Sequence, residues 1–234
     1  MTPTQALTAK PHQPVAPAWH TVVVVVLMLG ISFMGSRTRS FPGVSAYGHI
    51  VGYLLVMVVE WVTVAFIWFG IRRRGIAMSE LVGGKWARPR AVLLDVAIAI
   101  GFLIIAALIL NGIQYLLKAV QNPAIRSMFP HGPAEIFFYL LLVATAGFCE
   151  ELIFRGYLQR QFNALTHAAA GGIVLQGLVF GASHGYQGWK FMLIIAVFGM
   201  MFGLLAYWRR SLRPGMIAHF LQDGLGGLLG PHLH

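Results

Sequence analysis

Charged residues are scarce in this sequence, and acidic residues are the scarcest of them. Lys, Arg, Asp and Glu make up 10% of the 234 residues, whereas apolar residues make up 58%. A soluble domain carries about 25% charged residues, so this composition excludes an ordinary water-soluble fold. With a mean hydropathy of +0.74, the chain is expected to be surrounded by lipid.

Cysteine is almost absent as well. Cys149 is the single cysteine, which excludes an intrachain disulfide. It stands next to Glu150, so a nucleophilic thiol was one interpretation. A small residue in a packed helix is favoured instead, because no other feature marks this thiol as reactive.

The 17 basic residues outnumber the 7 acidic residues and leave a formal charge of +10. They lie mostly between apolar runs, which favours the loops of a membrane protein over nucleic-acid binding. With seven spans, twelve of the 17 fall on one side of the membrane. The positive-inside rule therefore predicts a cytoplasmic N-terminus and an extracytoplasmic C-terminus.

The chain divides into a short tail and one membrane domain. Residues 1–18 are rich in Pro, Thr, Gln and Ala without periodicity, and they predict a disordered tail. Residues 19–234 predict a single transmembrane domain. Its apolar runs, each close to the roughly 20 residues of a span, are 19–35, 47–71, 91–117, 134–162, 168–187, 190–208 and 214–230. The prediction is an all-α, polytopic transmembrane helical bundle of about seven spans, with six or eight as alternatives.

Small residues at helical spacing indicate where two of these spans touch. Gly177 and Gly181 form one G-x-x-x-G pattern, and Gly199 and Gly203 form another in the next span. Such pairs let helix backbones approach closely in a membrane. No internal repeat of the kind found in transporters is visible.

Several acidic residues fall within the apolar runs, where an ionisable group costs several kcal/mol unless it is paired or wet. They are Glu60, Asp95, Glu150, Glu151 and Asp223. For Glu60 and Asp95, a structural role is favoured, with Arg155, Lys118 or an interior water as alternative partners.

Glu150 and Glu151 are adjacent and point about 100° apart on a helix. Arg155 follows Glu151 by four residues, so these two can pair and leave Glu150 unpaired. Two adjacent carboxylates repel when both are ionised, which suits a general base or acid near neutral pH. A structural salt-bridge cluster at a helix end is the alternative.

Two histidines can join these acids. A turn is expected near His167, and Glu150 and His184 each lie 17 residues from that position. In an antiparallel hairpin they would be level and would face each other. Phe180 lies one turn before His184 and could wall the site. His219 and Asp223 share a face of the last span because they are four residues apart.

Three short motifs occur here in a specific order and spacing. They are E-E-x-x-x-R at Glu150, Glu151 and Arg155, F-x-x-x-H at Phe180 and His184, and H-x-x-x-N/D at His219 and Asp223. In these motifs the chain resembles the CAAX-processing type II prenyl endopeptidase and bacteriocin-processing (CPBP, Abi-like) family of intramembrane glutamic proteases. The resemblance covers about residues 134–230, the family-like catalytic core, whereas residues 1–133 are similar only in being spans.

The resemblance implies hydrolysis of a peptide bond in a membrane-tethered substrate, whether a prenylated CAAX peptide or an unprenylated one. Glu150 would activate water, and His184 would position that water and pass the proton to the leaving amine. His219 and residue 223 would stabilise the oxyanion, and Glu151 and Arg155 would hold the helix in register. Asp223 departs from the Asn of the pattern, so it must be protonated or must orient His219.

No cofactor is expected. Glu150, His184 and His219 are acceptable zinc ligands in type, but no H-E-x-x-H or other ligand spacing is present, so no metal is predicted. The expected partners are the lipid bilayer and a membrane-tethered peptide or protein, without nucleic acid. The alternatives are a non-catalytic immunity or scaffold protein on the same fold and a proton-coupled transporter.

Overall fold

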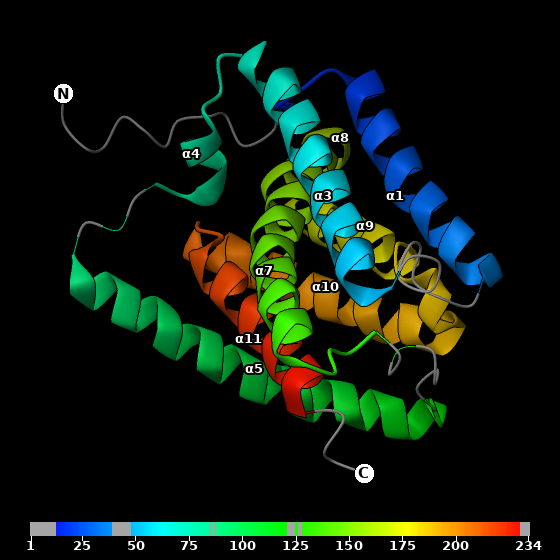
Figure 1. Ribbon diagram of the computed structural model, residues 1–234. Coiled ribbons are helices and arrows are strands. Elements are labelled where there is room, and N and C mark those ends of the chain that lie inside the picture. The colour runs from blue at the N-terminus through cyan, green and yellow to red at the C-terminus, as the bar shows by residue number, and fades with distance from the viewer. Residues whose placement is uncertain are drawn as a thin grey trace.

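The described chain is helical, as a chain that must satisfy its own backbone in lipid has to be. The computed structural model describes residues 13–38, 48–84, 86, 88–120, 125 and 128–229, with no side chains described at 36–38. The elements are α1 (Ala18–Thr38), α3 (His49–Arg72), α4 (Met78–Val82), α5 (Pro89–Leu117), α7 (Pro133–Glu150), the π-helix η2 (Glu151–Leu158), α8 (Gln159–Thr166), α9 (Ala169–Ala182), the 3₁₀ turn η3 (Gly185–Gln187), α10 (Trp189–Arg209) and α11 (Arg213–Leu229) (Figure 1). No strand occurs in these ranges, so the predicted all-α class is confirmed.

Five helices are long and apolar enough to cross a membrane: α1, α3, α5, α10 and the continuous run Pro133–Thr166 formed by α7, η2 and α8. α9 and α11 are shorter, with 14 and 17 residues. The polytopic helical bundle is confirmed, and the described residues form five candidate spans and two shorter helices where about seven spans were predicted. The fifth predicted run, 168–187, is the one that breaks: its helix ends at Ala182, where the Ser183 hydroxyl donates to the Phe180 carbonyl at 2.7 Å.

Residues 1–12 of the predicted tail lie outside the described residues. The end of that tail is packed rather than free, because Val15 and Ala16 are buried. The N–H groups of both donate to Gln161 Oε1, at 2.7 and 3.2 Å, and Gln161 Nε2 donates back to the Ala16 carbonyl at 3.0 Å. The packed domain therefore begins a few residues before α1.

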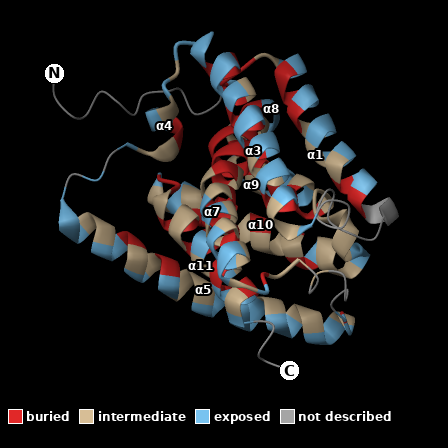
Figure 2. Ribbon diagram, viewed as in Figure 1, coloured by how far each residue is buried: buried red, intermediate tan, exposed pale blue. Residues whose placement is uncertain are grey.

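The predicted long fourth span contains a π-helical stretch that the periodicity did not reveal. Every residue of η2, Glu151–Leu158, is buried, and the segment lies in the red centre of the bundle in Figure 2. π-helical stretches place i→i+5 hydrogen bonds within α-helices and are frequent at functional sites. This one follows Glu150 directly and carries both Glu151 and Arg155 inside the bundle.

The G-x-x-x-G prediction is confirmed at the contact between α9 and α10. A Cβ added to Gly177 would lie 2.9 Å from both Ala196 O and Met200 N, and one on Gly181 would collide with the Met192 carbonyl. A Cβ on Gly199 would lie 3.1 Å from Gly177 Cα. Only glycine permits this approach, which brings α9 and α10 together.

One end of the bundle is assembled around the short helix α4. Arg160 Nη2 donates to the Glu80 carbonyl at 2.8 Å, and Leu212 N donates to the Val82 carbonyl at 3.0 Å. The basic segments after α3, in α8 and between α10 and α11 therefore gather at one end of the bundle. The prediction from the positive-inside rule likewise put these segments on one side of the membrane. At the other end, Lys190 Nζ donates to the Lys118 carbonyl at 3.1 Å.

Asp95 anchors α5 to this bundle and is only 1% exposed. Trp86 Nε1 donates to its Oδ2 at 2.8 Å, Arg209 donates to Oδ1 at 3.2 Å, and Arg213 Nε lies 3.6 Å from Oδ2. Asp95 thus has a structural role, but its partners are neither Arg155 nor Lys118. Trp86 and the two arginines reach it from loops and helix ends that the sequence could not place beside α5.

Candidate active site

Glu151 stands at the centre of a buried polar network. Its side chain is fully buried, and its Oε1 accepts hydrogen bonds from Arg155 Nη1 at 3.0 Å and from His219 Nδ1 at 3.1 Å. Gly215 on α11 makes room for the carboxylate, because a Cβ there would lie 2.9 Å from Glu151 Oε2. The predicted Glu151–Arg155 pair is present, and it also ties η2 to α11.

Gly215 was missed at the level of sequence. It lies four residues before His219, hence on the same helix face, and that spacing was the available signal.

Arg155 is held on several sides inside the bundle. Its guanidinium lies 4.3 Å from the centre of the Phe180 ring and 4.8 Å from that of Phe202, and Nη2 donates to the Gly199 carbonyl at 3.3 Å. Aromatic faces stabilise a cation most where water is excluded. Phe180 thus does more than wall the site, because it holds the cation that neutralises Glu151.

His219 lies among three carboxylates. Nδ1 faces Glu151, while Nε2 lies 3.4 Å from Asp223 Oδ2 and 3.7 Å from Glu150 Oε2. A neutral imidazole can donate from one ring nitrogen only, whereas an imidazolium donates from both. An imidazolium therefore satisfies this environment best, and the ring becomes the positive centre of the acid cluster.

Glu150 differs from Glu151 in its exposure and in its contacts. Its side chain is 20% exposed, and its Oε2 is a buried oxygen without a hydrogen-bond partner. The predicted division holds in the contacts: Arg155 pairs with Glu151, whose Oε1 accepts two hydrogen bonds, whereas no hydrogen bond reaches the Glu150 side chain among the described residues. Glu151 Oε2 also lacks a partner, so the two acids differ in exposure and in the donors that reach Oε1.

His184 lies in the turn after α9 rather than on the helix. Its Nδ1 is 2.8 Å from the Phe180 carbonyl and 3.2 Å from Ser183 Oγ, and its ring centre is 4.8 Å from that of Phe180. No hydrogen bond or ion pair joins it to Glu150 among the described residues. The direct facing of Glu150 and His184 therefore stays a prediction. The Phe180 ring lies between the two histidines, because its centre is also 6.3 Å from that of His219, and His219 in turn lies beside Glu150.

Asp223 is the most exposed of the three acids around His219, with a side chain 40% exposed. Tyr139 on α7 donates its phenol proton to the Asp223 backbone carbonyl at 2.9 Å, which fixes this turn of α11 against α7. The predicted pairing of His219 and Asp223 on one helix face is present at 3.4 Å.

One comparison with known proteins matched the part of the chain that carries these residues. Residues 132–225 match the family described as type II CAAX prenyl endopeptidase, Rce1-like. This segment is therefore similar to the Rce1-like family. The search of curated proteins and the search of solved structures returned no match.

The Rce1-like segment runs from the start of α7 into the second half of α11. All the residues named above for the site lie within it, and the resemblance seen in the three short motifs is confirmed. Together with the apolar helices, this similarity supports an integral membrane protein. Helices α1, α3 and α5 lie outside the matched segment.

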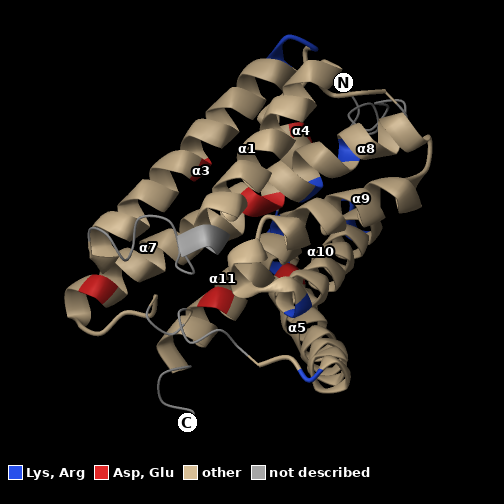
Figure 3. Ribbon diagram, turned by 90° about the vertical axis from the view of Figure 1, so that its right-hand side faces the viewer, with Lys and Arg blue, Asp and Glu red and all other residues tan. Residues whose placement is uncertain are grey.

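One of those outer helices nevertheless reaches the Rce1-like site. Glu60 on α3 is 9% exposed, and its electrostatic neighbours are Glu150, His219 and Asp223. Figure 3 marks acidic segments on α3 and α11 and at the end of α7. The sequence identified Glu60 as an intramembrane acid with Arg155, Lys118 or an interior water as alternative partners. Among the described residues, neither Arg155 nor Lys118 bonds to it.

The described residues were also searched for a metal site. Within the described part of the chain, no group of three or more His, Cys, Asp or Glu side chains is arranged to hold a metal ion.

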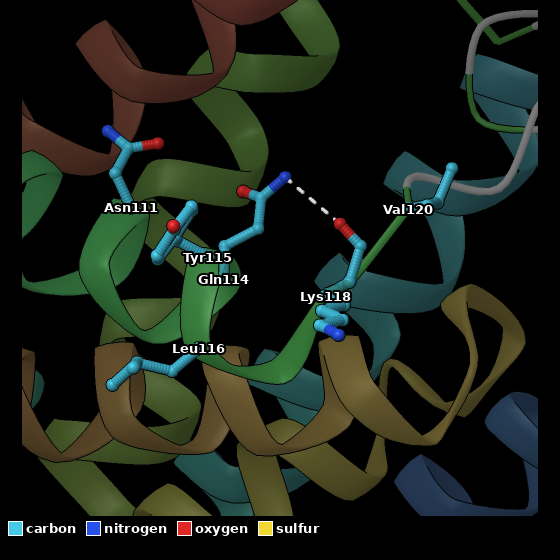
Figure 4. Close-up of a pocket in the computed structure, with 7 residues that line it drawn as sticks. Asn111, Gln114, Tyr115, Leu116, Lys118 and Val120 are labelled. Carbon is cyan, nitrogen blue, oxygen red and sulfur yellow. Dashed lines mark hydrogen bonds between the residues drawn. The ribbon is translucent and has the colours of Figure 1, made fainter.

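A hollow of about 660 Å³ lies at the C-terminal end of α5. There Gln114 donates to the Ala119 carbonyl at 3.3 Å, and Lys118 is the one charged lining residue (Figure 4). That hollow contains none of the predicted site residues.

Proposed function

We propose that this protein is an intramembrane endopeptidase that hydrolyses a peptide bond in a membrane-tethered substrate with water activated by Glu150. The observation that carries the proposal is the contrast between two adjacent acids. Glu151 Oε1 accepts hydrogen bonds from Arg155 and His219, whereas no hydrogen bond reaches the partly exposed Glu150 side chain among the described residues. A carboxylate oxygen left free in a partly open site can accept a proton from water.

In the first step, Glu150 takes a proton from water while the water oxygen attacks the scissile carbonyl carbon. The new C–O bond forms as the carbonyl π electrons move to its oxygen. In the second step the C–N bond breaks, and the leaving nitrogen receives the proton taken from water. The products are a carboxylic acid and an amine, and no covalent enzyme intermediate is formed.

His184 is suited to carry that proton. The Phe180 carbonyl can only accept a hydrogen bond, so the proton of the neutral imidazole sits on Nδ1. Nε2 is then a free base that can orient the water and relay the proton to the leaving amine.

His219 supplies positive charge where the oxyanion forms. Its Nε2 lies close to both Glu150 and Asp223, at 3.7 and 3.4 Å. Asp223 acts by orienting this ring, as the acid of an acid–histidine pair does, rather than by donating to the oxyanion. That role accommodates an aspartate where the motif also allows asparagine.

The test is reconstitution in liposomes with paired prenylated and unprenylated CAAX-type peptides and mass spectrometry of the products. Cleavage by the wild type and none by Glu150→Gln would support the proposal, and the peptide cut would name the substrate class. If every peptide stays intact with wild type and variant alike, or if Glu150→Gln remains fully active, the proposal fails.

A further inference from the structure

Glu60 is a buried acid without a cation bound to it. It lies in the middle of α3, 9% exposed, and its Oε2 is buried without a hydrogen-bond partner. Within the described residues no Lys, Arg or His forms an ion pair with it. A lone ionised carboxylate at this depth would be costly, so such a residue is a functional candidate that needs a charge state and a partner.

Aromatic contacts place Glu60 at the depth of Glu150. Helices α3 and α7 pack side by side, with Tyr53 against Tyr139 and Trp61 against Phe148, both at 5.6 Å between ring centres (Figure 1). Both pairs advance in the same chain direction, so the two helices run parallel. Glu60 precedes Trp61 by one residue and Glu150 follows Phe148 by two, which puts the carboxyls within about one helical turn.

The charged groups around Glu60 are mostly acidic. They are Glu150 from α7 and His219 and Asp223 from α11. With Glu151 the cluster holds four carboxyl groups, against two cationic groups, Arg155 and His219. Full ionisation would bury a net charge of −2, whereas a proton held between two carboxyls relieves both the repulsion and the desolvation.

We propose that Glu60 is a fourth acid of the active site, a carboxylic acid that donates a hydrogen bond to Glu150 so that the two share one proton. This rests on the proposed function only where it treats Glu150 as the base. Glu60 keeps its proton while Glu150 takes one from water, and Glu150 then releases that proton toward the leaving amine. Glu60 acts through Glu150 and is therefore a positioning residue.

The first test measures the proton and needs no substrate. Infrared spectra of the full protein in liposomes at pH 7 are compared for wild type, Glu60→Gln and Glu80→Gln, an acid of the short helix α4. We expect a carboxylic-acid C=O band in the wild type that disappears in Glu60→Gln and persists in Glu80→Gln. An unchanged band in Glu60→Gln would mean that Glu60 is ionised and would overturn the proposal.

The second test separates positioning from packing. Glutamine keeps the shape and a donor, so Glu60→Gln should keep kcat within about tenfold of the wild type. Leucine fills the space without a donor, so Glu60→Leu should lose about 10–100-fold in kcat with little change in KM, as when an orienting residue is removed. The matched control is Thr63→Val, one turn away on α3, whose buried hydroxyl bonds only its own helix at Val59.

The outcomes distinguish the two proposals. Full activity in Glu60→Leu, or loss of more than 100-fold in Glu60→Gln, would refute a neutral donor at this position. If Glu60→Leu does not fold, as judged by its melting temperature, the Glu60→Gln activity decides. If no peptide is cleaved by the wild type, the proposed function fails, while the infrared band still decides whether Glu60 holds a proton.

Discussion

Glu150 and Glu151 are neighbours in the chain, and their glutamine substitutions are expected to fail in different ways. Glu151→Gln removes the charge that compensates Arg155, which is 2% exposed and lies against two aromatic rings. Leaving one partner of a buried ion pair uncompensated costs about 3–5 kcal/mol. For a chain of this size that corresponds to a fall in melting temperature of roughly 6–20 °C.

Glu150→Gln should leave stability almost unchanged. The amide oxygen of glutamine can still accept the hydrogen bond proposed from Glu60, and the nearest cation, His219 Nε2, lies at 3.7 Å. A substitution that breaks no buried network changes stability by about 0.5 kcal/mol or less. Its rate, however, should fall by about 10²–10⁴, the range for loss of a general base.

The assay is the melting temperature of each purified variant in one detergent, paired with peptide cleavage in liposomes. Arg155→Met combined with Glu151→Gln serves as a control, because removing both charges should recover part of the stability that Glu151→Gln loses. Equal melting temperatures for the two single variants, or cleavage by Glu150→Gln at the wild-type rate, would refute the division of roles between the two acids.

Three further outcomes are expected. Gly181→Ala should destabilise the protein by about 1–3 kcal/mol, because the added Cβ collides at the α9–α10 contact. The measurement is thermal melting, and the control is Gly101→Ala on α5, where a Cβ meets nothing within 4 Å. An equal effect of the two substitutions would contradict the close approach of the helices. A metal chelator and serine or cysteine reagents should leave cleavage unchanged in Cys149→Ala, and loss with chelator restored by zinc would indicate a metal mechanism. A reporter fused after His234 should be active only on the extracytoplasmic side, since the basic segments gather at the opposite end, and a cytoplasmic signal would contradict the orientation.

Composition and spacing determined a large part of this protein. The apolar runs predicted the helices, because a span needs a length of apolar residues that is visible in the sequence itself. The i, i+4 relations of Glu151 with Arg155 and of His219 with Asp223 were also readable, since helical geometry fixes them locally. The order of the motifs was enough to identify the Rce1-like segment.

Apart from the G-x-x-x-G contact between α9 and α10, contacts between helices could not be predicted in this way. The rotation and depth of one helix relative to another depend on packing, and no local period encodes them. Counting residues from a turn predicts that Glu150 faces His184, and this stays a prediction. The count assumes α-helix throughout, whereas α9 ends at Ala182 and η2 is π-helical. The structure directs His184 Nδ1 to the Phe180 carbonyl.

The tertiary structure alone decided which acids lie beside Glu150. In the sequence, Glu60 and Asp95 were equivalent intramembrane acids with the same possible partners. Packing separated them: α5 carries Asp95 to two arginines at one end of the bundle, whereas α3 carries Glu60 to the level of Glu150. The physical reason is that a charge in a span is defined by its neighbours in space, and those neighbours come from helices far apart in the chain.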